Sequence, residues 1–350
     1  MRICFFQVVL VMLIACLCNA QGKRSYLRYH DSVRVIENDF FEEGDTSKKI
    51  LERYRRLFET YDFVYLQDCY TAMQIAIFLG DEKHFMKFME KATKNGLTRS
   101  NLNGFQYILK SDIYKKNEKA IGFMITEHRP HYLSRINKEL LVQFVKIYAE
   151  DQAQKNCLTG ESTADCMRRY NSAYQVELEK VMKLIAKYGM PSDKLIGVDQ
   201  KDILQELAIH NADLAHYYQK FKGFYNIAPS QYELDNRAVA STLMIPLMWH
   251  GNCSYLGLKP FLDRELEKGN IHPRDIAIIK DEDYRSVNLC ESRDSVYYNI
   301  GDEQLLQLSR QKINLNRANG FICSFEADSV KTVYQDRYKM VLRYGFLGKR

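Results

Sequence analysis

The sequence has little proline, little glycine and a single tryptophan. Six prolines and 17 glycines in 350 residues leave no room for long flexible linkers. Hydrophobic residues make up 46% of the chain and charged residues 27%, which excludes a disordered or collagen-like protein. The 24 tyrosines and 18 phenylalanines indicate an aromatic-rich interior instead. A chain of this length is expected to form about two domains.

The signature motifs of several large functional classes are absent as well. The sequence contains no GxSxG, Walker A, GxGxxG or EF-hand loop. No CxxC pair occurs, so neither a thioredoxin-type redox site nor a zinc ribbon is supported. The net charge is only +6, and its basic residues are interspersed with acidic ones, which argues against a nucleic-acid partner. We therefore expect no cofactor, and the sequence leaves open whether the protein is an enzyme.

Only one long apolar run is present, and it lies at the N-terminus. After Met1-Arg2, the run from Ile3 to Cys18 has Gln7 as its only polar residue. The run is short for a membrane span, which needs about 20 apolar residues, but it suits the central part of a secretory signal. Small residues in Cys18-Asn19-Ala20 predict cleavage before Gln21. The mature chain is then expected to have no transmembrane span.

Two alternatives to cleavage at this position stay open. Leu13-Ile14-Ala15-Cys16 resembles a bacterial lipobox, in which Cys16 would carry the lipid. The run would otherwise be an uncleaved anchor. We expect an extracytoplasmic protein, periplasmic or secreted, that is either soluble or lipid-anchored through Cys16.

Six cysteines lie beyond this leader, an even number that permits disulfides in an exported chain. Cys157 and Cys166 bracket a short polar loop and form the best candidate pair, which would stabilise the fold by about 2–3 kcal/mol. The alternative is two free thiols. Cys253 and Cys290 are a second candidate pair with less support from the sequence. Cys69 lies in an apolar segment, where we expect it to be packed as a small hydrophobic residue.

The first half of the chain has the apolar spacing of helices. Residues 21–45 are expected to be irregular, and a helical-hairpin domain is predicted over 46–131. Its first helix shows apolar residues at spacings of three and four: Ile50, Leu51, Tyr54, Leu57 and Phe58. Further helices are predicted to end at Gly80-Asp81 and at Asn95-Gly96, in the manner of a tetratricopeptide-like hairpin. Another pair is expected within 101–131, over 102–113 and 120–125.

Pro130 is expected to interrupt the helical pattern, and a second helical block begins near Ile136. Helices are predicted over 136–152, 176–188, 200–222, 238–249 and 255–266, with a loop at 157–171. Gly189 and Pro191 predict a helix end, and His272-Pro273 predicts a helix start. The strand signal is limited to 320–325 and the tail after Tyr338. We predict a mainly α fold with little or no β, in which the N-terminal hairpins are packed on a C-terminal helical domain.

Several short motifs in the second block resemble DUF6624, a bacterial family of uncharacterised proteins. The segment 139–157 is similar to the opening helix of that family, which ends in an Asp-Gln pair. Residues 187–197 resemble its Gly-Trp-Pro helix stop, although Met190 replaces the tryptophan. Trp249-His250-Gly251-Asn252 stands where members carry Gln-His-Ala-Asp, and 272–281 follows as in the family.

The resemblance covers about residues 136–300, followed by a C-terminal extension over 301–350. It implies a helical domain found in secreted or lipid-anchored bacterial proteins. It carries no established activity. Because Asn252 replaces the family's aspartate, the expectation of a His–carboxylate pair at this position is weaker.

His250 and Asn252 are the best-supported candidate site residues, because they follow an apolar run that is expected to be buried. A buried histidine needs hydrogen-bond partners, and Asp151 and Gln152 offer a carboxylate and an amide. The four residues would form a polar pocket that acts in acid–base chemistry or binds a ligand. Alternatively, His250 is a structural residue that joins two helices, and Asp151-Gln152 is an exposed helix end.

Two weaker histidine patterns remain. His210, Asp213 and His216 share one face of a predicted helix, a spacing that could hold a divalent metal, but no fourth ligand is indicated. The alternative is that these three residues lie on a solvent-exposed helix face without a ligand. We expect no metal. His128 and His131 flank Pro130, which is expected to break their register.

Two functional classes follow from these observations. The first is an exported helical binding or scaffold protein whose N-terminal hairpins present a groove to a protein or peptide. The second is an enzyme or small-ligand-binding protein with a polar pocket around His250 and Asp151. We favour the first, because no set of nucleophile, base and orienting residue is visible in the sequence.

Overall fold

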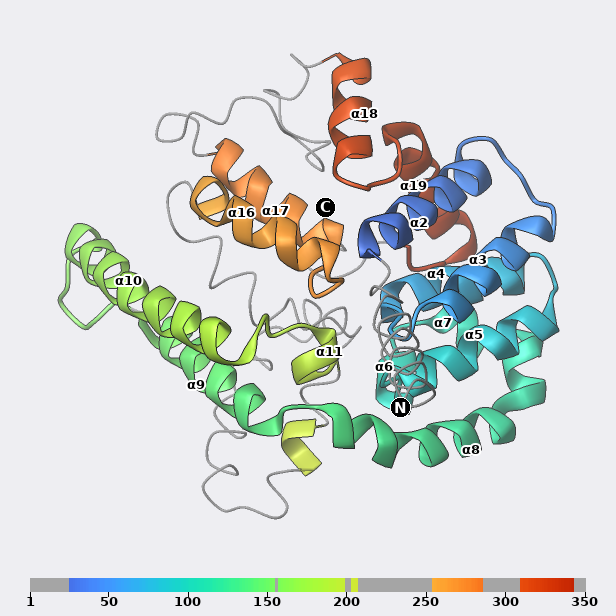
Figure 1. Ribbon diagram of the computed structural model, residues 1–350, viewed down its shortest axis with the longest axis horizontal. Helices are drawn as coiled ribbons and strands as arrows, with labels where there is room; N and C mark the ends of the chain where they lie inside the picture. Colours follow the sequence, from blue (N-terminus) through green and yellow to red (C-terminus); the bar gives the residue numbers. More distant parts are fainter. Residues whose placement is uncertain (1–24, 155–156, 199–202, 207–253, 286–308, 343–350) are drawn as a thin grey trace, which may run out of the picture.

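The computed structural model describes residues 25–154, 157–198, 203–206, 254–285 and 309–342. Within these ranges the regular elements are helices and no strand occurs, including at 320–325 and 339–342 (Figure 1). The predicted mainly α fold is therefore confirmed, and the two strand candidates are wrong within the described residues. None of the described helices combines the length and apolarity needed to cross a membrane.

The N-terminal half forms a layered helical body. Its helices are α2 (Tyr26–Phe41), α3 (Lys49–Thr60), α4 (Leu66–Phe78), α5 (Glu82–Lys94), the single turns α6 (Arg99–Leu102) and α7 (Gln106–Leu109), and the long α8 (Asp112–Arg135). The later helices are α9 (Lys138–Gln154), α10 (Thr163–Tyr188), α11 (Asp193–Ile196), α16 (Ser254–Glu267), α17 (Pro273–Arg285), α18 (Arg310–Asn319) and α19 (Phe325–Tyr338).

Helix α4 is the centre of the core. Every residue from Leu66 to Ala76 is buried, and α3, α5 and α7 contact the helix. Cys69 is fully buried and unpaired, so its predicted role as a small hydrophobic residue is confirmed. The ring of Tyr70 stacks on Phe105 with centroids 4.1 Å apart. The five apolar residues predicted for 50–58 are all buried against this centre.

The expectation of an irregular segment over 21–45 is wrong, because α2 occupies most of it. Tyr29, Val33, Ile36 and Phe40 form one buried stripe along this helix. Helix α2 contacts α3, α16 and α19, and Figure 1 shows it between the early and the late helices. The segment that was expected to be irregular is therefore a helix that contacts both early and late helices of the chain.

Two further expectations need correction. The helix pair predicted within 101–131 is replaced by the single turns α6 and α7 followed by α8. Pro130 does not interrupt the helix, since α8 continues to Arg135. The cost of a helical proline, about 3 kcal/mol, is opposed by the burial of Tyr132 and Ile136 just beyond it.

The predicted helix boundaries marked by turn residues are confirmed. Asp81 caps α5 by accepting a hydrogen bond from the His84 backbone. Gly189 ends α10 in a conformation with φ of 91°, and α17 begins at Pro273. In each case a local steric or hydrogen-bonding preference decides the boundary.

Helices α9 and α10 project together from the rest of the molecule (Figure 1). They contact each other along their length, and a disulfide between Cys157 and Cys166 closes the loop that joins them. The loop predicted over 157–171 is shorter than expected, because α10 begins at Thr163. The predicted disulfide is confirmed; Cys253 and Cys290 lie outside the described residues.

Candidate functional site

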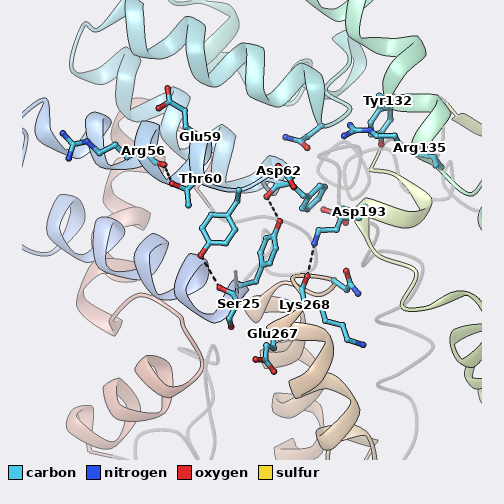
Figure 2. Close-up of a pocket in the computed structure, with 17 residues that line it drawn as sticks. Ser25, Arg56, Glu59, Thr60, Asp62, Tyr132, Arg135, Asp193, Glu267 and Lys268 are labelled. Atoms are coloured by element: carbon cyan, nitrogen blue, oxygen red, sulfur yellow. Dashed lines mark hydrogen bonds between the residues drawn. The ribbon is translucent and has the colours of Figure 1, made fainter. Parts of the chain in front are cut away.

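A cavity of about 1350 Å³ lies where the N-terminal helices meet the later ones. Its walls come from the start of α2, the end of α3 and the following loop, Asn95 after α5, the end of α8, α11 and the end of α16 (Figure 2). The volume exceeds the roughly 300–1000 Å³ of an ordinary small-molecule site. Segments far apart in the sequence thus build one large binding space.

Aromatic side chains form a continuous part of the wall. The rings of Tyr26 and Tyr61 are 4.9 Å apart, and the Tyr26 hydroxyl donates to the Phe63 carbonyl at 3.1 Å. The Tyr61 hydroxyl donates to the Ser25 carbonyl at 3.2 Å. Burial raises the pKa of Tyr26 to about 12, so this hydroxyl remains a donor at neutral pH. The wall is fixed by these hydrogen bonds.

Lys194 on α11 covers part of this aromatic wall. Its ammonium lies 4.0 Å from the centroid of the Tyr26 ring and 5.3 Å from that of Phe63. It also donates a hydrogen bond to the Lys268 carbonyl at 3.0 Å, at the end of α16 (Figure 2). Ring faces and a carbonyl together provide an environment that favours a cation.

Tyr132 near the end of α8 is enclosed by two glycines. A Cβ at Gly96 would lie 2.2 Å from its ring, and one at Gly197 would lie 2.8 Å from its hydroxyl. Both glycines also have positive φ values, of 102° and 83°. The backbone N–H of Val198 donates to the Tyr132 hydroxyl at 2.8 Å. This side of the cavity therefore depends on two close backbone approaches.

The basic side chains of the cavity are already engaged. The Arg56 side chain bonds Glu52 at 3.0 Å, and Lys268 bonds Glu265 at 2.7 Å. Arg135 donates to the Lys94 carbonyl at 2.5 Å, and Lys194 has the contacts given above. Each cation is thus oriented by a partner within the chain.

Two acidic side chains of the cavity are not engaged in this way. Asp62 and Glu267 are exposed, and their carboxylates have no ion-pair partner among the described residues. Glu59, in contrast, pairs with Arg55. The unengaged charges of the cavity are negative.

A buried polar cluster lies behind the aromatic wall. The Tyr29 hydroxyl donates to Asp68 Oδ2 at 2.7 Å, and His272 Nε2 faces Asp68 Oδ1 at 3.6 Å. The Arg274 backbone N–H donates to His272 Nδ1 at 3.2 Å, which assigns the ring hydrogen to Nε2. Burial acts to raise the pKa of Asp68, but the facing His272 ring and the Tyr29 hydroxyl outweigh it, so this pKa is lowered.

This Asp–His pair is a structural connection and not a reactive one. His272 is 6% exposed and Asp68 is 1% exposed, so neither reaches a ligand in the cavity. Both imidazole nitrogens face partners within the protein, which leaves none to accept a substrate proton. The pair joins the buried helix α4 to the start of α17.

His30 adds a second buried imidazole to this cluster. Its ring lies 5.6 Å from that of His272, edge to face. Burial, followed by repulsion from His272 and Lys194, places the pKa of His30 well below its ordinary value. Burial also lowers the pKa of His272, against the opposing effect of Asp68. Both rings are therefore neutral at neutral pH.

Charged residues from three helices, together with the Cys323 thiol, continue the buried network. Glu37 on α2 accepts from Arg274 at 3.2 Å and pairs with Lys331 of α19 at 2.9 Å. Lys331 also donates to Cys323 Sγ at 3.4 Å. All four side chains are buried or nearly so. Removing one member would leave a buried charge without its counterion.

The structure describes only part of the site expected from the sequence. Asp151 is fully buried on α9 and accepts a hydrogen bond from the Tyr170 hydroxyl at 3.1 Å. The alternative of an exposed helix end at Asp151 is therefore wrong. Gln152 lies on the same helix, and its side chain is not described. Asp151 does not line the large cavity.

The remaining candidates lie outside the described residues. They are His250 and Asn252 of the proposed pocket, His210, Asp213 and His216 of the weak metal pattern, and Cys16 of the lipobox. The pairing of His250 with Asp151 thus stays a prediction. His128 and His131 both lie on α8, which keeps its helical register through Pro130.

The sequence interpretation missed Asp68, His272 and the cavity. One signal was present: Asp68 stands inside an apolar helix, where a carboxylate requires buried partners. Those partners, Tyr29 and His272, lie 39 and 204 positions away, which local patterns do not reveal.

Comparison with known proteins found no match: no family model, curated protein or solved structure is similar to this chain. The resemblance to DUF6624 therefore stays a prediction.

Proposed function

We propose that this protein is a helical binding protein whose large cavity receives an extended segment of a partner protein. The observation that carries the proposal is the cavity itself, with its size, its aromatic wall and its charged residues from separate helices. Such a mixture of rings and polar groups is typical of recognition surfaces. Aromatic rings, four carboxylates and four basic side chains from separate helices line this surface among the described residues.

The shape of the surface supports an elongated ligand. A second hollow of about 640 Å³ lies between α2 and α3 and shares Arg56, Thr60 and Tyr61 with the cavity. A chain in extended conformation, at about 3.3 Å per residue, could follow both hollows. A small molecule would need only one of them.

We also propose that the protein acts outside the cytoplasm. The apolar run from Ile3 to Cys18 supports export, and the resemblance to DUF6624 implies the same compartment. The disulfide between Cys157 and Cys166 is consistent with an oxidising environment. Fractionation of cells that express the full chain, with and without Cys16→Ala, distinguishes a released protein from a lipid-anchored one.

The binding proposal is tested by filling the cavity. Thr60 is exposed at the junction of the two hollows, and its hydroxyl only bonds the Arg56 carbonyl of its own helix. Thr60→Trp is therefore expected to block the junction without unfolding the protein. Ser172→Trp is the matched control, because Ser172 is exposed on α10 and bonds the Arg168 carbonyl in the same way.

The readout is binding to an array of synthetic decapeptides of varied charge and aromatic content. Peptides bound by the native protein and by Ser172→Trp, but lost with Thr60→Trp, would support the proposal. Equal binding by all three proteins would place the interaction elsewhere and refute it, and so would the absence of any bound peptide.

A further inference from the structure

We infer that the partner segment is basic and places a lysine or arginine side chain in the cavity, near Asp62 and Glu267. This inference rests on the proposed function and adds the chemical class of the ligand. It starts from the cavity charges, since each basic side chain has an internal partner whereas two carboxylates have none among the described residues. A ligand cation could pair with these two carboxylates.

Lys91 attracts the Asp62 charge at longer range but forms no ion pair with its carboxylate. Lys91 donates to the backbone carbonyls of Tyr61 at 2.7 Å and Asp62 at 3.3 Å, so its ammonium is committed to the main chain. The carboxylate of Asp62 remains exposed in the loop between α3 and α4. The loop is thus fixed in place while its acidic side chain stays exposed to solvent.

Glu267 is in the same situation on the opposite side of the ligand space. It lies in the last turn of α16, and its neighbour Lys268 pairs with Glu265 at 2.7 Å. A carboxylate at a helix C-terminus is unfavourable in isolation, because it adds to the negative end of the helix dipole. A ligand cation would relieve that repulsion.

An internal ammonium already shows how this cavity holds a cation. Lys194 is seated 4.0 Å from the Tyr26 ring centroid and 3.0 Å from the Lys268 carbonyl oxygen. This contact shows that the aromatic wall accommodates a positive group. A lysine or arginine of the ligand would lie beside this wall, where Asp62 and Glu267 could pair with it.

The size of the surface favours a peptide over a free polyamine. The cavity and the adjoining hollow provide about 1350 and 640 Å³, far more than a single aliphatic amine fills. Backbone groups and further side chains of a peptide would occupy the remainder. We therefore commit to a basic peptide segment.

The test uses three fluorescein-labelled octapeptides, Gly-Ser-Lys-Gly-Ser-Lys-Gly-Ser and two versions in which glutamine or glutamate replaces both lysines. Fluorescence anisotropy is measured with the full chain. We expect the lysine peptide to bind at least about fivefold more tightly than the glutamine peptide, from two exposed ion pairs, and the glutamate peptide to bind weakest. The preference should decrease as salt is raised from 50 to 300 mM.

The carboxylates are tested with Asp62→Asn and Glu267→Gln. Each change is expected to weaken binding of the lysine peptide roughly twofold to fivefold. Glu179→Gln is the matched control, since Glu179 is exposed on α10 and likewise has no ion-pair partner among the described residues. Circular dichroism confirms that each variant is folded.

The outcomes separate this inference from the proposed function. Equal binding of the lysine and glutamine peptides, still lost with Thr60→Trp, would overturn the basic ligand while keeping the binding cavity. Unchanged binding by both carboxylate variants, or no binding of the lysine peptide up to 1 mM, would also overturn it. Spermidine binding as tightly as the lysine peptide would exclude a peptide-specific site.

Discussion

Helix α4 is enclosed by helices on several sides, whereas α10 is packed mainly on α9. The whole segment from Leu66 to Ala76 is buried, but α10 buries only one stripe and exposes Met167 and Val176. The first helix is therefore stabilised by burial from many directions. The second depends on one partner helix and on a covalent link.

The difference also appears in the polar residues of each helix. Gln74 of α4 exchanges two hydrogen bonds of 2.7 Å with the backbone of Val341, and Asp68 of the same helix contacts Tyr29 and His272. Buried polar residues of α4 thus fix distant parts of the chain. On α10, the Tyr170 hydroxyl bonds Asp151 of the neighbouring helix α9.

The largest expected effect is a cavity in the α4 core. Phe88 of α5 is 1% exposed and lies against Phe58, with ring centroids 5.5 Å apart. Phe88→Ala is expected to lower the free energy of unfolding by about 3–5 kcal/mol, since the lost ring leaves a void. Val176→Ala, on the exposed face of α10, should change it by less than about 0.5 kcal/mol. Urea denaturation measures the free energy of unfolding of both variants. Similar losses in the two would contradict the difference between the α4 core and α10.

The next effect concerns the covalent link of the projecting pair. Replacing both Cys157 and Cys166 with serine opens a short loop and is expected to cost about 2–3 kcal/mol. Hydrogen exchange should show faster exchange in α9 and α10 and little change in α4. Equal acceleration in α4 would mean that the two regions unfold as one unit, contrary to the comparison.

Acidification should destabilise the core around α4, because its buried histidines are neutral in the folded protein. The pKa of His30 is below the value of about 6.5 for an unfolded imidazole, so the unfolded chain takes up this proton first as the pH falls. Its contribution to stability is complete above about pH 7 and is lost progressively as the pH falls below about 6.5. His272 acts in the same direction, whereas Asp68 loses its contribution only below about pH 4.

The variant His30→Phe isolates this effect. It keeps a ring beside Tyr29 and His272 but removes one titrating group, so its stability should fall less between pH 7 and pH 5 than that of the native protein. Chemical denaturation at both pH values provides the measurement. Identical pH dependence of the two proteins would show that His30 is not the group that titrates.

The smallest effect is expected at the contact between α9 and α10. Tyr170→Phe removes the hydrogen bond to Asp151 and should cost about 1 kcal/mol. The loss should be greater when the disulfide is also absent, because the pair then has fewer constraints. A double-mutant cycle measures this coupling, and strict additivity would contradict it.

Much of the fold follows from local patterns. The apolar spacing of residues 50–58 predicts α3, and Gly189 and Pro273 mark helix boundaries as expected. These features depend on neighbouring residues, where steric and capping preferences are decisive. The disulfide is predictable for the same reason, since its two cysteines bracket one short loop.

Helix α2 shows where such patterns fail. Its buried stripe contains the polar residues His30 and Glu37, which interrupt the apolar spacing. Their partners His272, Arg274 and Lys331 lie more than 200 positions away, so only the tertiary structure reveals why they are buried. The cavity was missed for the same reason, because its walls come from six separate parts of the chain.

The enclosure of Tyr132 has a consequence for sequence divergence. Neither Gly96 nor Gly197 can gain a side chain while the tyrosine ring keeps its place, and a smaller residue at 132 would remove the donor–acceptor contact with Val198. The three positions are therefore expected to change together or not at all. A distant homologue that retains the cavity would carry glycine, tyrosine and glycine at these spacings, even where the surrounding helices have lost all recognisable identity.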